Sequence, residues 1–250
     1  MTFRFRVGVA LLCAALLVAG CGSELKVAAT ELGGPDTLGL SAEGERVKGV
    51  VVYFHGADQS ARVLQDSEKH AEFFDSMLRA GYAVVAADAG GNAYGNPQSR
   101  DDYRRLISAA TQHYGTTDLF YVSESMGTLA ALALLSADTQ HQVKGLVGIT
   151  PLMALPPEAR AVSYIQGPWA GAVPDAADPV TWPPEAFAGR DFRLYRAAED
   201  DTIPDDAGAR AFADQFGEVA QIDVIDCPGG HVAPECYRGD EVANWMAERN

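Results

Sequence analysis

The sequence predicts an α/β fold built on a doubly wound, mostly parallel sheet, and two observations carry that prediction. Short apolar runs alternate with segments of helical spacing along most of the chain, which is the order expected of a parallel sheet. The runs are nearly continuous in apolar residues, as in KGVVVYF at residues 48–54, and such runs are typical of strands buried on both faces. With 250 residues and no internal repeat, the chain is expected to form one main domain.

The N-terminus has the pattern of an export signal. Arg4 and Arg6 precede an uncharged apolar run, which ends in VAGC at residues 18–21. The run is well short of the roughly 20 residues that cross a bilayer as a helix, so a cleaved signal peptide is favoured over a membrane span. VAGC resembles a bacterial lipobox, which implies that residues 1–20 are removed and that Cys21 carries lipid. The protein would then be exported and anchored at the extracytoplasmic side of the cell membrane. The alternative is a soluble secreted protein cleaved nearby.

The remainder divides into a short lead and a main domain. Residues 21–45 are polar and rich in glycine, and are expected to form a tether with edge strands at 26–31 and 37–41. The main domain is expected over residues 46–250. Its strands are expected at residues 47–54, 82–87, 119–122, 143–150, 191–198 and 219–225. Its helices are expected at residues 61–80, 99–114, 129–135, 205–216 and 239–248.

The segment at about residues 151–190 differs from the rest of the domain. It is rich in proline and contains Trp169 and Trp182. A long connection inside a compact domain is usually functional. We therefore expect a short cap insertion that lies over a site at the end of the sheet.

Residues 119–130, LFYVSESMGTLA, pass from a strand pattern directly into a helix pattern. The turn has the spacing small-x-Ser-x-Gly around Ser125, with Ser123 where glycine is usual. Small neighbours let a serine adopt a strained conformation between strand and helix, close to a helix N-terminus that favours negative charge. Ser125 is therefore a candidate nucleophile. The alternative is an ordinary loop that happens to contain serine and glycine.

A serine nucleophile needs a base, and position along the chain favours two of the 5 histidines. His231 follows the last expected strand, and His55 ends the first strand of the main domain, so both belong to the sheet edge where catalytic loops gather. The others lie in helix patterns or in a polar turn, namely His70, His113 and His141.

A third group, which orients the base, is expected after a strand and between the serine and the histidine. The segment EDDTIP at residues 199–204 provides Asp200 and Asp201 there. Either carboxylate could accept a hydrogen bond from the imidazole, and residue type alone does not separate them. The one not used would be a surface acid near the next helix.

Together these motifs resemble the α/β-hydrolase superfamily over about residues 47–249. SESMG resembles its nucleophile elbow, DDTIP its acid turn Asp-x-x-(Val/Ile)-Pro, and GGH its histidine loop. By that resemblance the catalytic residues, in the chain order of the family, are Ser125, Asp200 and His231.

The same resemblance covers the first strand end of the main domain. HGA at residues 55–57 resembles the oxyanion turn of the superfamily. This implies that the backbone amides of Ala57 and Met126 form an oxyanion hole, and that His55 is structural.

Several function classes are excluded by charge and motif. The formal net charge is −15 and no basic patch offsets it, so nucleic acid is not an expected partner, and a lipid rather than surface charge would hold the chain at a membrane. The glycine-rich loop at residues 90–95 follows a strand, but Asn92 stands where a dinucleotide-binding loop needs glycine. The sequence has neither a Walker loop nor zinc-ligand spacing, so no cofactor and no metal is implied.

Cysteine usage fits an exported domain. Of the 4 cysteines, Cys13 lies in the signal and Cys21 is the expected lipid site, which leaves Cys227 and Cys236. An even pair in an oxidising compartment indicates a disulfide. The alternative is two free, buried thiols.

The sequence thus predicts a serine hydrolase that cleaves a carboxylic ester, in a small-molecule or lipid-like substrate, through an acyl-enzyme. An ester is favoured over an amide only because an alcohol leaves more readily. The same residues would serve a peptidase or an acyltransferase, and a non-catalytic binding protein could keep the same fold.

Overall fold

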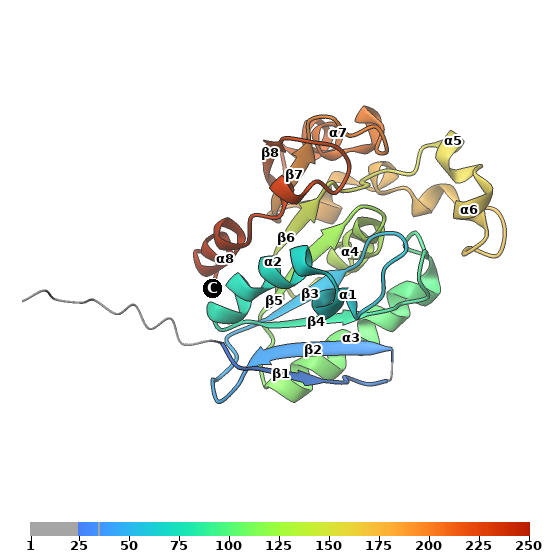
Figure 1. Ribbon diagram of the computed structural model, residues 1–250. Coiled ribbons are helices and arrows are strands. Elements are labelled where there is room, and N and C mark those ends of the chain that lie inside the picture. Colours follow the sequence, from blue (N-terminus) through green and yellow to red (C-terminus); the bar gives the residue numbers. More distant parts are fainter. Residues whose placement is uncertain (1–24, 35) are drawn as a thin grey trace, which may run out of the picture.

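The computed structural model describes residues 25–34 and 36–250 and confirms the expected fold class (Figure 1). One sheet of 8 strands has the order β1-β2-β4-β3-β5-β6-β7-β8. β3 to β8 are parallel, whereas β1 and β2 form an antiparallel edge. The strands are β1 (Val27–Thr30), β2 (Thr37–Ala42), β3 (Val50–Phe54), β4 (Ala83–Ala87), β5 (Leu119–Glu124), β6 (Val143–Ile149), β7 (Asp191–Ala197) and β8 (Gln221–Cys227).

Helices cover both faces of the sheet. α2 and α8 share one apolar core with one face, while α3, α4 and α7 share another core with the opposite face. The α-helices are α1 (Val63–Asp66), α2 (Glu68–Arg79), α3 (Pro97–Tyr114), α4 (Gly127–Ser136), α5 (Pro157–Arg160), α6 (Ser163–Gln166), α7 (Ala209–Phe216) and α8 (Gly239–Ala247). The 3₁₀ helices are η1 (Asp175–Ala177), η2 (Pro179–Thr181), η3 (Pro184–Phe187), η4 (Asp205–Ala207) and η5 (Pro234–Cys236).

The central strands and α4 are buried on all sides, which explains their composition. Every residue of β3, β4 and β5 is buried, as the continuous apolar runs require. α4 is buried from Gly127 to Leu135, so its leucines and alanines show no polar face. This helix starts directly at the candidate nucleophile, and its burial gives that turn a rigid support.

The segment between β6 and β7 forms the cap and contains α5, α6 and η1 to η3. In Figure 1, α5 and α6 (yellow) project to one side of the sheet. Leu155, Ile165 and Val173 of this segment share an apolar cluster with Met126 and Leu129 at the start of α4. The cap therefore packs on the helix that follows Ser125.

Two of the expected helices are interrupted. Residues 61–80 divide into α1 and α2 at Ser67, which is extended with φ −111° and ψ 116°. The Ser67 hydroxyl lies 2.7 Å from Nδ1 of His70 and does not cap α2, a local hydrogen bond that competes with helix continuation. Residues 205–216 divide into η4 and α7 at the extended Gly208. Neither break is encoded by apolar spacing.

The expected signal peptide, residues 1–20, and the expected lipid site Cys21 lie outside the described residues. Within the ranges that the structure describes, none of the helices combines the length and the apolar character needed to cross a membrane.

Candidate active site

The turn between β5 and α4 holds Ser125 in a strained conformation. Ser125 has φ +50°, in the left-handed region that residues with a Cβ rarely adopt. The chain must turn this sharply because α4 starts against the end of β3. A Cβ added at Gly127 would overlap the carbonyl oxygens of Phe54 and His55, so only glycine allows this close approach.

Ser123 occupies the position where the motif usually has glycine. It is fully buried, and its hydroxyl donates to the carbonyl of Val147 at 3.3 Å while accepting from the Thr128 hydroxyl at 3.0 Å. Both hydrogen-bonding roles of this hydroxyl are therefore satisfied. Serine fits here because it is small and its one polar group has partners.

The structure brings Ser125, His231 and Asp200 together from three loops. Nε2 of His231 lies 2.9 Å from Oγ of Ser125, and Nδ1 of His231 lies 2.9 Å from Oδ2 of Asp200. The loops follow β5, β8 and β7, whose carboxyl ends meet at one edge of the parallel sheet. With the proton on Nδ1, the ring would donate to Asp200 and accept from Ser125.

The structure also separates the two candidate aspartates. Oδ1 of Asp200 accepts from the backbone amides of Thr202 at 2.9 Å and Ile203 at 3.0 Å, which leaves Oδ2 facing the imidazole. Asp201 is exposed, and among the described residues its carboxylate has one hydrogen-bond partner, the Thr202 hydroxyl at 3.5 Å. Asp200 thus has the acceptor geometry that an orienting carboxylate needs, and Asp201 does not.

The turn after β3, residues 55–59, is called the β3 turn below. His55 is buried, with Nδ1 2.7 Å from the carbonyl oxygen of Gly56 and Nε2 2.8 Å from that of Asp88. Its ring therefore braces the β3 turn against the residue that follows β4. Ala57 is exposed, and neither its amide nor that of Met126 donates to another described residue. Two unengaged amides are what an oxyanion site requires.

Two hydrogen bonds between Asp58 and Asn92 also hold the β3 turn in place. The amide of Asp58 donates to Oδ1 of Asn92 at 2.7 Å, and Nδ2 of Asn92 donates to Oδ1 of Asp58 at 2.8 Å. The glycine-rich loop that contains Asn92 thus serves to hold the turn. This contact gives a structural use to the residue that departs from a dinucleotide-binding pattern.

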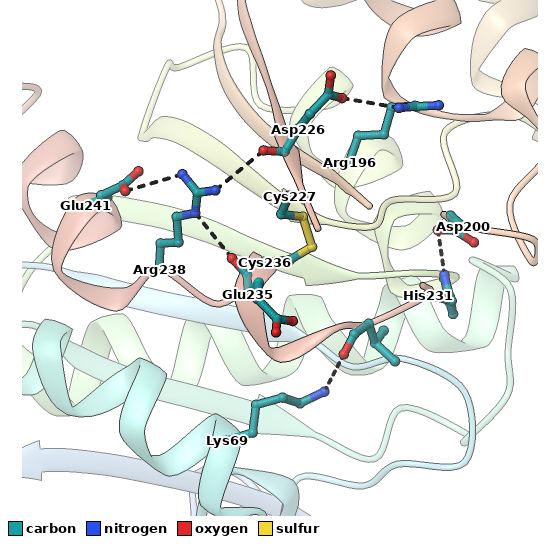
Figure 2. The surroundings of a disulfide bond; sticks show 11 residues. Lys69, Arg196, Asp200, Asp226, Cys227, His231, Glu235, Cys236, Arg238 and Glu241 are labelled. Atoms are coloured by element: carbon teal, nitrogen blue, oxygen red, sulfur yellow. Dashed lines mark hydrogen bonds and ion pairs between the residues drawn. A yellow bond between two sulfur atoms is a disulfide. The ribbon is translucent and has the colours of Figure 1, made fainter. Parts of the chain in front are cut away.

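The segment from Cys227 to Tyr237, called the histidine loop, carries His231 and is closed by a disulfide. Cys227 and Cys236 are bonded, as the cysteine count indicates, and the bond spans a sequence separation of 9. Figure 2 shows the ring of His231 directed at Asp200, away from the disulfide. The carbonyl of Gly229 also accepts from the amide of Glu199 at 3.0 Å, which joins the histidine loop to the acid loop.

Sequence reasoning missed a buried polar cluster directly beside Ser125. Glu124 is 2% exposed, and its carboxylate contacts four side chains, namely Tyr53, Gln59, His70 and Tyr237. These residues come from β3, the β3 turn, α2 and the end of the histidine loop. The only sequence signal was a charged residue at the end of a mostly apolar strand. His70 lies in α2, as its helix pattern predicts, but its ring is buried in this cluster, whereas His113 and His141 are exposed and take no part in the site.

Among the described residues, no group of three or more His, Cys, Asp or Glu side chains is placed to share a metal ion. The site consists of a hydroxyl, an imidazole, a carboxylate and backbone amides. That arrangement can remove a proton from Ser125 and stabilise an anion next to it.

A family model described as serine aminopeptidase, S33, matches residues 45–177, more than half of the chain. No curated protein sequence matches this chain. Among solved structures, the HSL homolog EstE7 from a metagenome library is 15% identical with a TM-score of 0.67, over 90% of this chain and 86% of that one. TT1662 from Thermus thermophilus is 16% identical with a TM-score of 0.65, over 90% and 98%. Est1E from Butyrivibrio proteoclasticus is 16% identical with a TM-score of 0.65, over 89% and 98%. At these identities the likeness establishes the fold alone, which is the α/β-hydrolase fold.

Removal of the disulfide should lower stability, since a cross-link over so short a loop removes mainly unfolded-state entropy. Replacement of both Cys227 and Cys236 by Ser is expected to cost about 2–3 kcal/mol, and to lower Tm by about 5–10 °C in a domain of this size. Calorimetry of the double variant, with the reduced wild type beside it, provides the measurement. Two alkylatable thiols in unreduced, exported protein would contradict the bond itself.

Proposed function

This chain belongs to the serine aminopeptidase family S33, and we propose that it is a serine hydrolase that cleaves a carboxylic ester through Ser125, His231 and Asp200. The single observation that carries the proposal is the hydrogen-bonded chain from Ser125 Oγ through both ring nitrogens of His231 to Asp200, with 2.9 Å at each step. A hydroxyl, a base and an orienting carboxylate in this order form an activated nucleophile.

In the first half of the reaction, Nε2 of His231 takes the proton from Ser125 as Oγ attacks the ester carbonyl carbon. Asp200 accepts from Nδ1–H and stabilises the imidazolium that forms. The tetrahedral intermediate then collapses, the carbon–oxygen bond to the alcohol breaks, and His231 gives its proton to the departing oxygen. Water repeats the cycle on the acyl-enzyme, which releases the acid and restores the Ser125 hydroxyl.

We assign the oxyanion to the amides of Ala57 and Met126. Met126 directly follows the nucleophile, and its amide lies at the N-terminus of α4, where the helix dipole favours negative charge. The Ala57 amide belongs to the β3 turn, which His55 and Asn92 hold from two sides. A preorganised pair of donors of this kind contributes about 3 kcal/mol to barrier lowering.

The choice of an ester rather than a peptide bond as the substrate is a separate part of the proposal. The structural neighbours include a putative esterase from Staphylococcus aureus and the Pyrococcus furiosus esterase Pf2001, which supports an ester, while the match to the serine aminopeptidase family supports a peptide bond. The deciding experiment compares p-nitrophenyl esters of increasing acyl length with aminoacyl p-nitroanilides, on protein that lacks residues 1–21. Faster turnover of the anilides would make it a peptidase, and faster transfer to an added alcohol than to water would make it an acyltransferase.

Replacement of Ser125 by Ala should abolish ester turnover while leaving the fold intact. Loss of the nucleophile is expected to lower kcat by about 10⁴-fold or more, and to end labelling by a fluorophosphonate probe. Circular dichroism and Tm serve as the folding control. Probe labelling that persists in the variant would place the nucleophile elsewhere, and a wild type that neither labels nor turns over any ester would favour a binding protein.

The two aspartates should differ sharply on conversion to Asn. Asp200→Asn replaces the acceptor that faces Nδ1 of His231 and should lower kcat on the order of 10³- to 10⁴-fold. Asp201→Asn is its matched control one residue away, exposed and outside the hydrogen-bonded chain, and should stay within about twofold of wild type. The opposite ranking would reassign the orienting carboxylate.

We also propose that the protein is exported and anchored by lipid on Cys21. The support is the basic, apolar and small-residue pattern that ends in VAGC, together with a disulfide in the domain, which fits an oxidising compartment.

Replacement of Cys21 by Ser should move the protein from the membrane fraction to the soluble exported fraction and prevent incorporation of labelled fatty acid. The signal itself is unchanged, so export should continue. Immunoblots of the fractions provide the measurement, and a wild type that is soluble and unlabelled would remove the anchor.

A further inference from the structure

We propose that Glu124, the residue before the nucleophile, is a positioning residue whose buried carboxylate fastens the β3 turn and the histidine loop to the turn that holds Ser125. The inference rests on the proposed function, because the two fastened segments carry the proposed oxyanion donor Ala57 and the proposed base His231. Glu124 is not among the groups that we propose to act on the substrate. Its contacts lie beneath the site, on the face of the sheet covered by α2.

The first connection reaches the β3 turn through Gln59. Nε2 of Gln59 donates to Oε1 of Glu124, and Oε1 of Gln59 accepts from the amide of Gly56 at 3.1 Å. A Cβ added at Gly56 would overlap Oε1 of Glu124, so the turn passes directly against the carboxylate. The amide of Ala57 therefore takes its place from a turn that is hydrogen-bonded to the residue next to Ser125.

The second connection reaches the histidine loop through Tyr237. The Tyr237 hydroxyl donates to Oε2 of Glu124, and Tyr237 directly follows the disulfide-bonded Cys236. Lys69 of α2 strengthens this connection, since its Nζ lies 4.1 Å from the centroid of the Tyr237 ring and donates to the carbonyl of Val232 at 2.9 Å. Figure 2 shows Lys69 directed at the histidine loop from the helix beneath it. Both ends of the segment that follows His231 are thus held.

The charge of Glu124 is what allows these connections to coexist. Nε2 of His70 lies 2.8 Å and the Tyr53 hydroxyl 2.9 Å from Oε2, and the side chains of His70 and Glu124 are 3% and 2% exposed. Burial raises the pKa of Glu124, but the hydrogen bonds from His70, Tyr237 and Tyr53 and the attraction of His70 outweigh it and lower the pKa to about 2. An ionised carboxylate accepts on both oxygens, whereas an amide has one accepting and one donating end. Glutamine cannot accept from all the donors that surround this position.

The obvious alternative is a buried ion pair that only stabilises the fold. The two roles differ in what they predict. A purely structural pair would lower Tm when altered and leave the turnover number of the folded fraction unchanged. A positioning residue would lower kcat with little change in KM, because the misplaced groups are those that act on the reacting bond rather than those that bind substrate.

The sharpest variant is Tyr237→Phe, which removes one hydroxyl and keeps the ring that packs on Phe73, His70 and Lys69. We expect kcat for the best ester to fall on the order of 10- to 100-fold, with KM within about twofold. Tyr82→Phe is the matched control. Tyr82 is a buried tyrosine, whose hydroxyl accepts from Asn250 at 3.3 Å, and it begins the segment that leads into β4 at the opposite edge of the sheet. Its kcat should equal that of wild type.

A coupling test separates action through Glu124 from independent effects. Glu124→Gln should lower kcat at least as much as Tyr237→Phe, and adding Tyr237→Phe to it should change kcat by less than about twofold, because the acceptor is already altered. An unchanged kcat in folded Tyr237→Phe, or full additivity of the two variants, would overturn the proposal. If Glu124→Gln does not fold, Gln59→Met in the Tyr237→Phe background replaces it, and a kcat equal to that of wild type again overturns the proposal.

A spectroscopic readout keeps this test distinct from the proposed function. The proton between Nδ1 of His231 and Asp200 should give a downfield imidazole NMR resonance in the wild type that is absent from His231→Asn. Tyr237→Phe should broaden or shift this resonance and Tyr82→Phe should not. If no ester is turned over but the resonance responds in this way, the proposed function fails and the positioning role stands. If esters are turned over and neither kcat nor the resonance responds to Tyr237→Phe, the positioning role fails and the proposed function stands.

Discussion

The close contact between the start of α4 and the end of β3 is the constraint on which the site depends. Gly127 lies so close to the carbonyls of Phe54 and His55 that no side chain fits between them. That contact forces the chain at Ser125 into a left-handed conformation and sets the nucleophile directly above the β3 turn. A strained residue persists only where its surroundings over-determine it. Here they do, because β3 and β5 are paired along their length and α4 is buried from Gly127 to Leu135.

The parallel sheet then determines which loops lie next to the turn that holds Ser125. β5, β7 and β8 all point their carboxyl ends to the same edge, so the loops that carry Ser125, Asp200 and His231 converge there although they are far apart in sequence. Short loops limit the remaining freedom. The carboxylate of Asp200 accepts from the backbone amides of Thr202 and Ile203, and the disulfide closes the histidine loop. Each catalytic candidate is thus held by its own strand and by a local restraint.

A buried, charged cluster lowers the stability of the fold unless every group in it is paired. Glu124 meets that condition, with partners on both oxygens from β3, the β3 turn, α2 and the histidine loop. Such a cluster specifies one arrangement of the loops more strictly than apolar packing would, since each partner must lie within hydrogen-bonding distance. The sheet thus brings the loops together, and the polar cluster beneath them sets their relative positions. The cap then packs on the start of α4 through apolar contacts, and the amide of Leu152 donates to the carbonyl of Ser125 at 3.0 Å.

The sequence by itself predicted the fold class, the succession of the main strands and helices along the chain, the strand-turn-helix around Ser125 and a bond between Cys227 and Cys236. These depend on local patterns or on residue counts, namely apolar period, small residues around a turn and an even number of cysteines. Residue type left Asp200 and Asp201 equal, and only a family resemblance separated them; the structure adds the reason, which is that the Thr202 and Ile203 amides turn one carboxylate toward the imidazole. Tertiary structure alone decided the bracing role of Asn92 and the partners of Glu124. Those contacts join residues up to 113 positions apart, and no local pattern records which distant side chains a buried carboxylate will meet.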